Sequence, residues 1–178
     1  MKLLIIMLFF SINSHSQAMK NYTMDKKYFS CKIPAKWSLE RQKDSDIESN
    51  IYKIVVKEPK KNTSITIKYY ALKSNKDIKT YIETQSKNSQ GKLETPTEKY
   101  EAIKEIEFKS KKATEINKKL KEFQSIENDS NSYWLKERIL VIPAKKGFYS
   151  VIYSAKEEDF DKSLPIYEKV INSLKTLY

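Results

Sequence analysis

The chain has 178 residues and a formal net charge of +11, with 34 Lys and Arg against 23 Asp and Glu. Its one histidine, His15, lies in an apolar N-terminal leader, and its one cysteine is Cys31. Once that leader is removed, the chain has no residues for a Ser-His-Asp or Cys-His nucleophile, or for His- or thiolate-ligated zinc. With two glycines in all, it also lacks a glycine-rich loop for a nucleotide phosphate. We expect no metal, no cofactor and no enzymatic activity.

The first eighteen residues, MKLLIIMLFFSINSHSQA, have the organisation of a secretory signal peptide (1–18). An apolar run follows a lysine, and Ser16 and Ala18 place small residues at the −3 and −1 positions of a cut before Met19. A cut between Ser16 and Gln17 is the alternative. The apolar run is about half the roughly 20 residues of a spanning helix, which argues against an uncleaved membrane anchor. The mature protein is therefore expected to be secreted or periplasmic, and not membrane-spanning after cleavage.

The single cysteine and the basic residues limit which covalent links and which binding partners are expected. Cys31 lies too far beyond the leader for lipidation and cannot form an internal disulfide alone, so we expect a buried strand residue, with an exposed thiol or an intermolecular bridge as alternatives. Loss of Lys2 with the leader leaves 33 basic against 23 acidic residues, or +10. Only Arg41 and Arg138 are arginines, which predicts a solvated basic surface and no specific nucleic-acid partner. An anionic surface stays open as a partner.

The mature chain is predicted to contain an N-terminal spacer over 19–27 and one domain over 28–178. The domain opens with YFSCKIPAKWSLE, which predicts a strand, an Ile-Pro break and a second strand that begins at Trp37. The β-branched run 51–58 and the alternating run 64–71 then predict a hairpin.

A helix is predicted next, with Ser74 as the N-cap and Asp77 three residues later as a variant of the capping box. A strand follows over 102–110. The run 111–126 is ambiguous, because its apolar residues fit helical spacing while two of them also fit one face of a strand.

The clearest strands are 133–144 and 147–155, which a short turn joins into a hairpin. A C-terminal helix is predicted to begin with Ser163 as its cap and Pro165 in its first turn. Its apolar stripe is Tyr167, Val170, Ile171, Leu174 and Leu177. The order of strands, helix, strands and helix predicts an α+β domain with an antiparallel sheet covered by helices.

Two stretches resemble the PsbP-like superfamily, which includes the photosystem PsbP proteins, DcrB-type bacterial envelope proteins and Ran-binding Mog proteins. YFSCKIPAKWSLE is similar to the family's Phe-x-x-x-hydrophobic-Pro-x-x-Trp opening. GFYSVIYSAKEEDFDKSLPIYEKVINSLK is similar to its last strand, acidic and aromatic turn, and C-terminal helix. The resemblance implies a PsbP-like fold with a strand over 111–126 and a domain that binds or steadies another protein. Phe29, Ile33 and Trp37 are then expected in the core, with a ligand-stacking Trp37 as the alternative.

Three functions remain open. The first is a non-catalytic extracytoplasmic accessory or protein-binding domain of the bacterial envelope, with an envelope protein as its partner. The alternative is a salt-sensitive binder of lipid headgroups, polysaccharide or DNA through lysines. The third is a carboxylate hydrolase, although no acidic pair is distinctive. Tyr133 and Trp134 are the candidate partner-contact residues, because neighbours on a strand point to opposite faces and one of them is expected to be exposed.

Overall fold

The computed structural model describes residues 17–24, 26–42, 49–74, 76–123 and 132–176, and its strands form two antiparallel sheets there. The larger sheet contains β3 (Ser38–Arg41), β4 (Ile51–Lys57), β5 (Ser64–Ala71), β6 (Glu98–Tyr100), β7 (Lys104–Phe108), β8 (Lys111–Phe123), β9 (Ser132–Ala144) and β10 (Gly147–Lys156). The smaller sheet contains β1 (Met19–Thr23), β2 (Phe29–Pro34) and β11 (Lys175–Thr176). The helical elements are η1 (Leu72–Ser74), α2 (Ile78–Ser86) and α3 (Glu157–Ser173).

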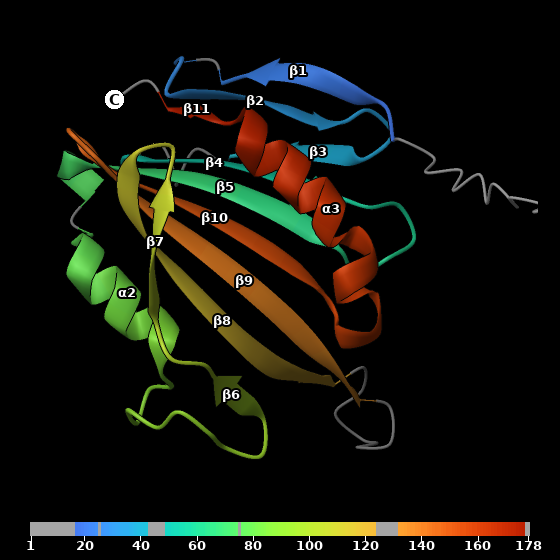
Figure 1. Cartoon of the computed structure of the whole chain (residues 1–178), viewed down its shortest axis with the longest axis vertical. Coiled ribbons are helices and arrows are strands. Elements are labelled where there is room, and N and C mark those ends of the chain that lie inside the picture. The colour runs from blue at the N-terminus through green and yellow to red at the C-terminus, as the bar shows by residue number, and fades with distance from the viewer. Residues whose placement is uncertain (1–16, 25, 43–48, 75, 124–131, 177–178) are drawn as a thin grey trace, which may run out of the picture.

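The larger sheet runs in the order β3-β4-β5-β10-β9-β8-β6, with β7 also paired to β8, and the smaller sheet runs β1-β2-β11. Figure 1 shows α3 crossing the larger sheet beside β2 and β11. The prediction of an α+β domain with an antiparallel sheet covered by helices is confirmed, and the structure adds a second, smaller antiparallel sheet. No helix in the described part of the chain is long and apolar enough to cross a bilayer.

Alternation along β10 separates the two cores. The side chains in the core that includes α3 and β2 are Tyr149, Val151, Tyr153 and Ala155. Phe148 and Ile152 belong to the second core, under α2. The sequence predicted both faces of this strand, because alternate side chains of a strand point to opposite faces.

The run 111–126 forms strand β8 as far as Phe123, so its helical spacing was misleading. β8 pairs with β9 from Thr114↔Val141 to Phe123↔Ser132. Ala113 packs in the α3 core, whereas Ile116, three residues later, packs under α2. The three-residue spacing of Ala113 and Ile116, which resembles that of a helix, thus comes from a strand that is buried on both faces at this point.

Both predicted helix starts were wrong. Ser74 lies in η1, and the N-cap of α2 is Asp77, whose carboxylate accepts a hydrogen bond from the Thr80 N–H at 2.9 Å. The C-terminal helix starts at Glu157, so Ser163 and Pro165 lie inside it. Three acidic residues occupy its first turn, where they complement the positive end of the helix dipole.

The predicted spacer 19–27 is also part of the fold. Met19–Thr23 form β1, which pairs with β2, and Met24 is buried in the core. Residues 1–16 of the predicted leader, and Leu177 of the predicted stripe, lie outside the described residues.

Candidate functional site

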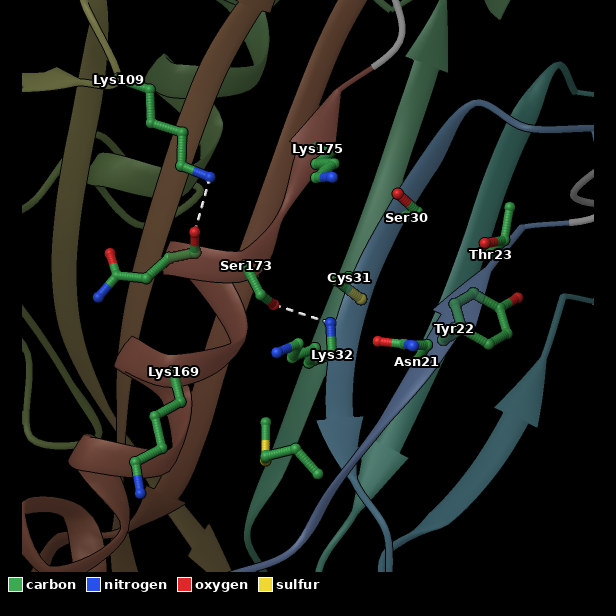
Figure 2. A pocket seen from close by; sticks show the side chains of 12 residues that line it. Asn21, Tyr22, Thr23, Ser30, Cys31, Lys32, Lys109, Lys169, Ser173 and Lys175 are labelled. Carbon is green, nitrogen blue, oxygen red and sulfur yellow. Dashed lines mark hydrogen bonds between the residues drawn. The ribbon is translucent and has the colours of Figure 1, made fainter.

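A groove of about 920 Å³ lies on the outer face of the smaller sheet, beside the C-terminal end of α3 (Figure 2). Four lysines reach it, and we call it the lysine groove: Lys32 of β2, Lys109 between β7 and β8, Lys169 of α3 and Lys175 of β11. Most of its other lining residues carry hydroxyl or amide groups. None of its twelve lining residues is acidic.

Strand alternation builds the floor of this groove. The alternate residues of β2 that are buried toward the core are Phe29, Cys31 and Ile33. The residues between them face the groove, and antiparallel pairing with β1 places Asn21 beside Lys32 and Thr23 beside Ser30. β11 pairs with the other edge of β2 and places Lys175 beside Ser30. Three strands thus contribute polar side chains to one surface.

Two contacts hold the end of α3 against this floor (Figure 2). The Lys32 N–H donates to the Ser173 hydroxyl at 2.7 Å, and that hydroxyl donates to the Val170 carbonyl, also at 2.7 Å. The Lys109 ammonium donates to the carbonyls of Asn172, at 2.8 Å, and Leu174, at 2.6 Å. A cation at this position satisfies carbonyls that a helix C-terminus leaves without partners.

The lysines of the groove differ in how they are engaged. Partial burial, with the nearby Lys175 charge, lowers the pKa of Lys109, whose ammonium is already bonded to the end of α3. Lys32, Lys169 and Lys175 are exposed, and none of them forms an ion pair with another described residue. Three ammonium groups therefore face solvent around a hollow without a compensating acid among its lining residues.

The predicted contact residues Tyr133 and Trp134 lie elsewhere, at the start of β9, and do not line the lysine groove. Both are half-buried, so the expected contrast of one exposed and one buried ring is absent. The Asn62 amide donates to the Tyr133 hydroxyl at 2.7 Å. The Lys156 ammonium lies 4.5 Å from the Tyr133 ring centroid, and that of Lys99 lies 5.9 Å from the Trp134 centroid. Their role as contact residues stays a prediction.

The predicted core residues of the opening stretch are confirmed. Phe29, Ile33 and Trp37 are all buried, so Trp37 is not a ligand-stacking surface. Cys31 is buried as expected, and desolvation raises the pKa of its thiol to about 12. Within the described residues, no group of three or more His, Cys, Asp or Glu could hold a metal ion.

Comparison with known proteins identifies the fold. No protein-family model matches the sequence, and no curated protein matches it. Among solved structures, the solution structure of cyanobacterial PsbP (CyanoP) from Synechocystis superposes with a TM-score of 0.60 over 90% of this chain and 93% of that chain, at 11% sequence identity. The chain has a PsbP-like fold.

A second similar structure is a crystal structure from Bacteroides thetaiotaomicron, with a TM-score of 0.53 and 11% identity. The match covers 91% of this chain and 49% of that one, so it spans about half of the larger protein. At these identities the similarity concerns the fold alone. It agrees with the resemblance that the opening stretch and the last strand and helix carry in the sequence.

Proposed function

We propose that the protein is a non-catalytic extracytoplasmic accessory protein of the bacterial envelope, and that its lysine groove binds an anionic part of a partner protein. The observation that carries this proposal is the groove itself, in which Lys32, Lys169 and Lys175 surround about 920 Å³ without an acidic lining residue. The leader pattern supports a location outside the cytoplasm. The accessory role is what the resemblance of the sequence to the PsbP-like superfamily implies, and the PsbP-like fold agrees with that resemblance.

The energetics favour reversible binding. Exposed ion pairs contribute about 0.2–1 kcal/mol each, so three lysines contribute roughly 0.6–3 kcal/mol to the binding free energy. That corresponds to a factor of about 3–150 in Kd. The polar side chains beside the lysines, among them Asn21 and Asn172, would have to supply directional hydrogen bonds in addition.

A crosslinking pull-down from the native envelope, read by mass spectrometry at low and high salt, tests the proposal. The groove variant replaces Lys32, Lys169 and Lys175 by Gln. Its matched control replaces three exposed lysines outside the groove by Gln: Lys87, Lys92 and Lys145. Both variants lose three positive charges, so they differ only in where the charge is removed.

We expect the wild type and the control to recover one protein, with less of it at high salt because exposed ion pairs are screened, and the groove variant to lose most of it at both salt concentrations. Equal recovery by all three proteins would refute the groove as the binding site. Equal loss from both variants would show that total charge matters and not this surface.

That last outcome would favour a second candidate function, a salt-sensitive binder of anionic surfaces. Its supporting observation is the +11 charge of the chain, almost all of it lysine and much of it outside the groove. It predicts sedimentation with phosphatidylglycerol vesicles, and retention on heparin or duplex DNA, that falls steeply with salt. Absence of binding to all three at low salt would exclude it.

A further inference from the structure

Among the described residues, no strand pairs with the outer edge of β1. Two hydrogen bonds at the ends of the β1–β2 ladder fix which backbone groups face β2: Met24 N–H donates to the Phe29 carbonyl at 3.0 Å, and Ala35 N–H donates to the Ala18 carbonyl at 2.8 Å. Hydrogen-bonded and non-hydrogen-bonded pairs alternate along an antiparallel ladder. The residues of β1 at even positions therefore direct their N–H and C=O groups toward β2.

The backbone groups of the alternate residues, Met19, Asn21 and Thr23, then point away from β2. β1 is the terminal strand of its sheet, and these groups have no hydrogen-bond partner in the described part of the chain. Figure 1 shows β1 at the margin of the molecule. An open row of donors and acceptors of this kind is a template for one more strand.

The side chains of the same three residues line the lysine groove. A strand added to β1 would therefore turn every second side chain toward the face that carries Lys32 and Lys175. Figure 2 shows Asn21, Lys32, Ser30 and Lys175 side by side across the three strands. The open edge and the positive surface thus meet at one place.

We propose that the occupant of this edge is an extended acidic segment of a partner protein, which adds to β1 as a further strand and places alternate carboxylates in the lysine groove. This inference rests on the proposed function and specifies its partner. Main-chain hydrogen bonds to β1 would provide the alignment, and the lysines would select acidic side chains.

The dimensions agree with this arrangement. Neighbouring strands lie about 4.8 Å apart, so an added strand lies about 10 Å from the backbone of β2, a gap that a lysine and a glutamate side chain span together. Alternate residues along a strand are about 7 Å apart, and the five residues of β1 therefore match about three acidic side chains on one face.

Charge argues against a second copy of this chain on the same edge. Two β1 strands would bring two lysine grooves together, and Lys20, exposed on β1, would meet the other copy's basic edge. Like charges across neighbouring strands are destabilising, and lysine on an edge strand is a common device against self-pairing. An acidic segment meets no such repulsion.

The test uses the peptide fluorescein-Thr-Glu-Val-Glu-Val-Glu-Thr-amide, labelled at its N-terminal amine, and fluorescence anisotropy. A peptide of the same composition with adjacent glutamates controls for charge. Two further peptides carry N-methyl groups on the glutamate amides or on the valine amides. Only one of these two sets can face β1 in an added strand, so one N-methylated peptide should bind at least about tenfold more weakly than the other.

Hydrogen exchange on the mature protein provides an internal control. The Lys20 and Tyr22 amides face β2 and should exchange slowly with or without the alternating peptide. The Asn21 and Thr23 amides should exchange quickly alone and slowly with the peptide. Asn21→Pro removes an outward N–H without breaking the β1–β2 ladder, and Asn21→Ala removes the same side chain but keeps the N–H. We expect the proline variant to bind about tenfold more weakly than the alanine variant.

The possible failures are distinguishable. If the alternating and adjacent peptides bind equally, with equal effects of both N-methyl sets and no change in exchange, then strand addition is refuted, while the binding of anions by the groove survives. If no peptide binds but the pull-down still depends on Lys32, Lys169 and Lys175, the groove has a partner that is not an extended acidic strand. If the pull-down is also insensitive to these lysines, both proposals fail.

Discussion

Replacing Gly147 by alanine should destabilise the fold strongly, because this residue has no room for a side chain. Gly147 starts β10, where it pairs with both Ala71 and Ala144. Its φ is +130°, and a Cβ at this position would lie 1.9 Å from the Tyr70 carbonyl oxygen. The clash is with backbone and not with a flexible side chain, so β5 and β10 would have to separate at their paired ends.

The magnitude can be worked out against Gly91, the other glycine of the chain. Gly91 has φ +77° and nothing within 4 Å of a Cβ, so Gly91→Ala incurs only the left-handed backbone strain of about 1–2 kcal/mol. Reduced entropy of the unfolded chain offsets about 0.4–1 kcal/mol of this in either variant. Gly147→Ala incurs about 1–3 kcal/mol of strain, and a lost ladder hydrogen bond adds about 0.5–1.5 kcal/mol. The midpoints of these ranges give net losses of about 1 kcal/mol at Gly91 and about 2 kcal/mol at Gly147, to which the clash with the Tyr70 carbonyl adds.

Urea unfolding of the mature protein, followed by circular dichroism, measures both variants. The free energy of unfolding should fall by at least about 1 kcal/mol more for Gly147→Ala than for Gly91→Ala, with unchanged m-values. If the two variants lose the same amount, the close approach of Gly147 to the Tyr70 carbonyl is not a determinant of stability and the reasoning is wrong.

Three other predictions concern titration, reactivity and the N-terminus. Burial raises the pKa of Tyr167 above its ordinary 10.0, so the contribution of the neutral phenol to stability is complete below about pH 10 and is lost as the pH rises further. Tyr167→Phe should therefore reduce the decline of the unfolding free energy above pH 10 by up to about 1.4 kcal/mol per pH unit. An identical decline in the wild type and the variant would contradict the assignment. Because Cys31 is 4% exposed and its pKa is raised to about 12, iodoacetamide should alkylate it at about pH 8 only as fast as the protein unfolds, whereas rapid labelling of the folded protein would show an accessible thiol. The Ala18 carbonyl accepts a hydrogen bond from the Ala35 N–H, so the free energy of unfolding of a chain that begins at Gln17 should be about 0.5–1.5 kcal/mol higher than that of a chain that begins at Met19. Equal urea midpoints for the two chains would refute this. The mass of the exported protein identifies the natural start.

The sequence predicted elements well where one periodicity dominated. β5 and β10 carry apolar side chains at period two, and their existence and the faces of β10 were correctly predicted. β8 was ambiguous because its apolar residues serve two cores on opposite faces. The first turns of α3 were missed because EEDFD combines four acids with one phenylalanine, which is typical of a turn as well as of a helix start.

The lysine groove could not have been predicted in the same way. Its lysines come from β2, a turn, α3 and β11, and the residues joined by the Lys32–Ser173 hydrogen bond are 141 positions apart. No local pattern reports which lysines will share a surface without acids. β1 was itself missed as a strand because it is mostly polar. Its two apolar residues, Met19 and Tyr22, fall on opposite faces, so they produce no alternating pattern.

The pairing of β2 with β11 also has a consequence for the order in which the protein folds. β2 is among the first segments to be synthesised, yet its core face is covered by α3 and one of its edges is completed by β11, at the far end of the chain. Contacts of such separation require closure of a loop that includes nearly the whole domain, which slows folding. The core face of β2 therefore stays exposed to solvent until α3 and β11 have been synthesised. A chain that ends before α3 would leave the apolar side chains of Phe29 and Ile33 exposed to solvent, and we expect it to aggregate.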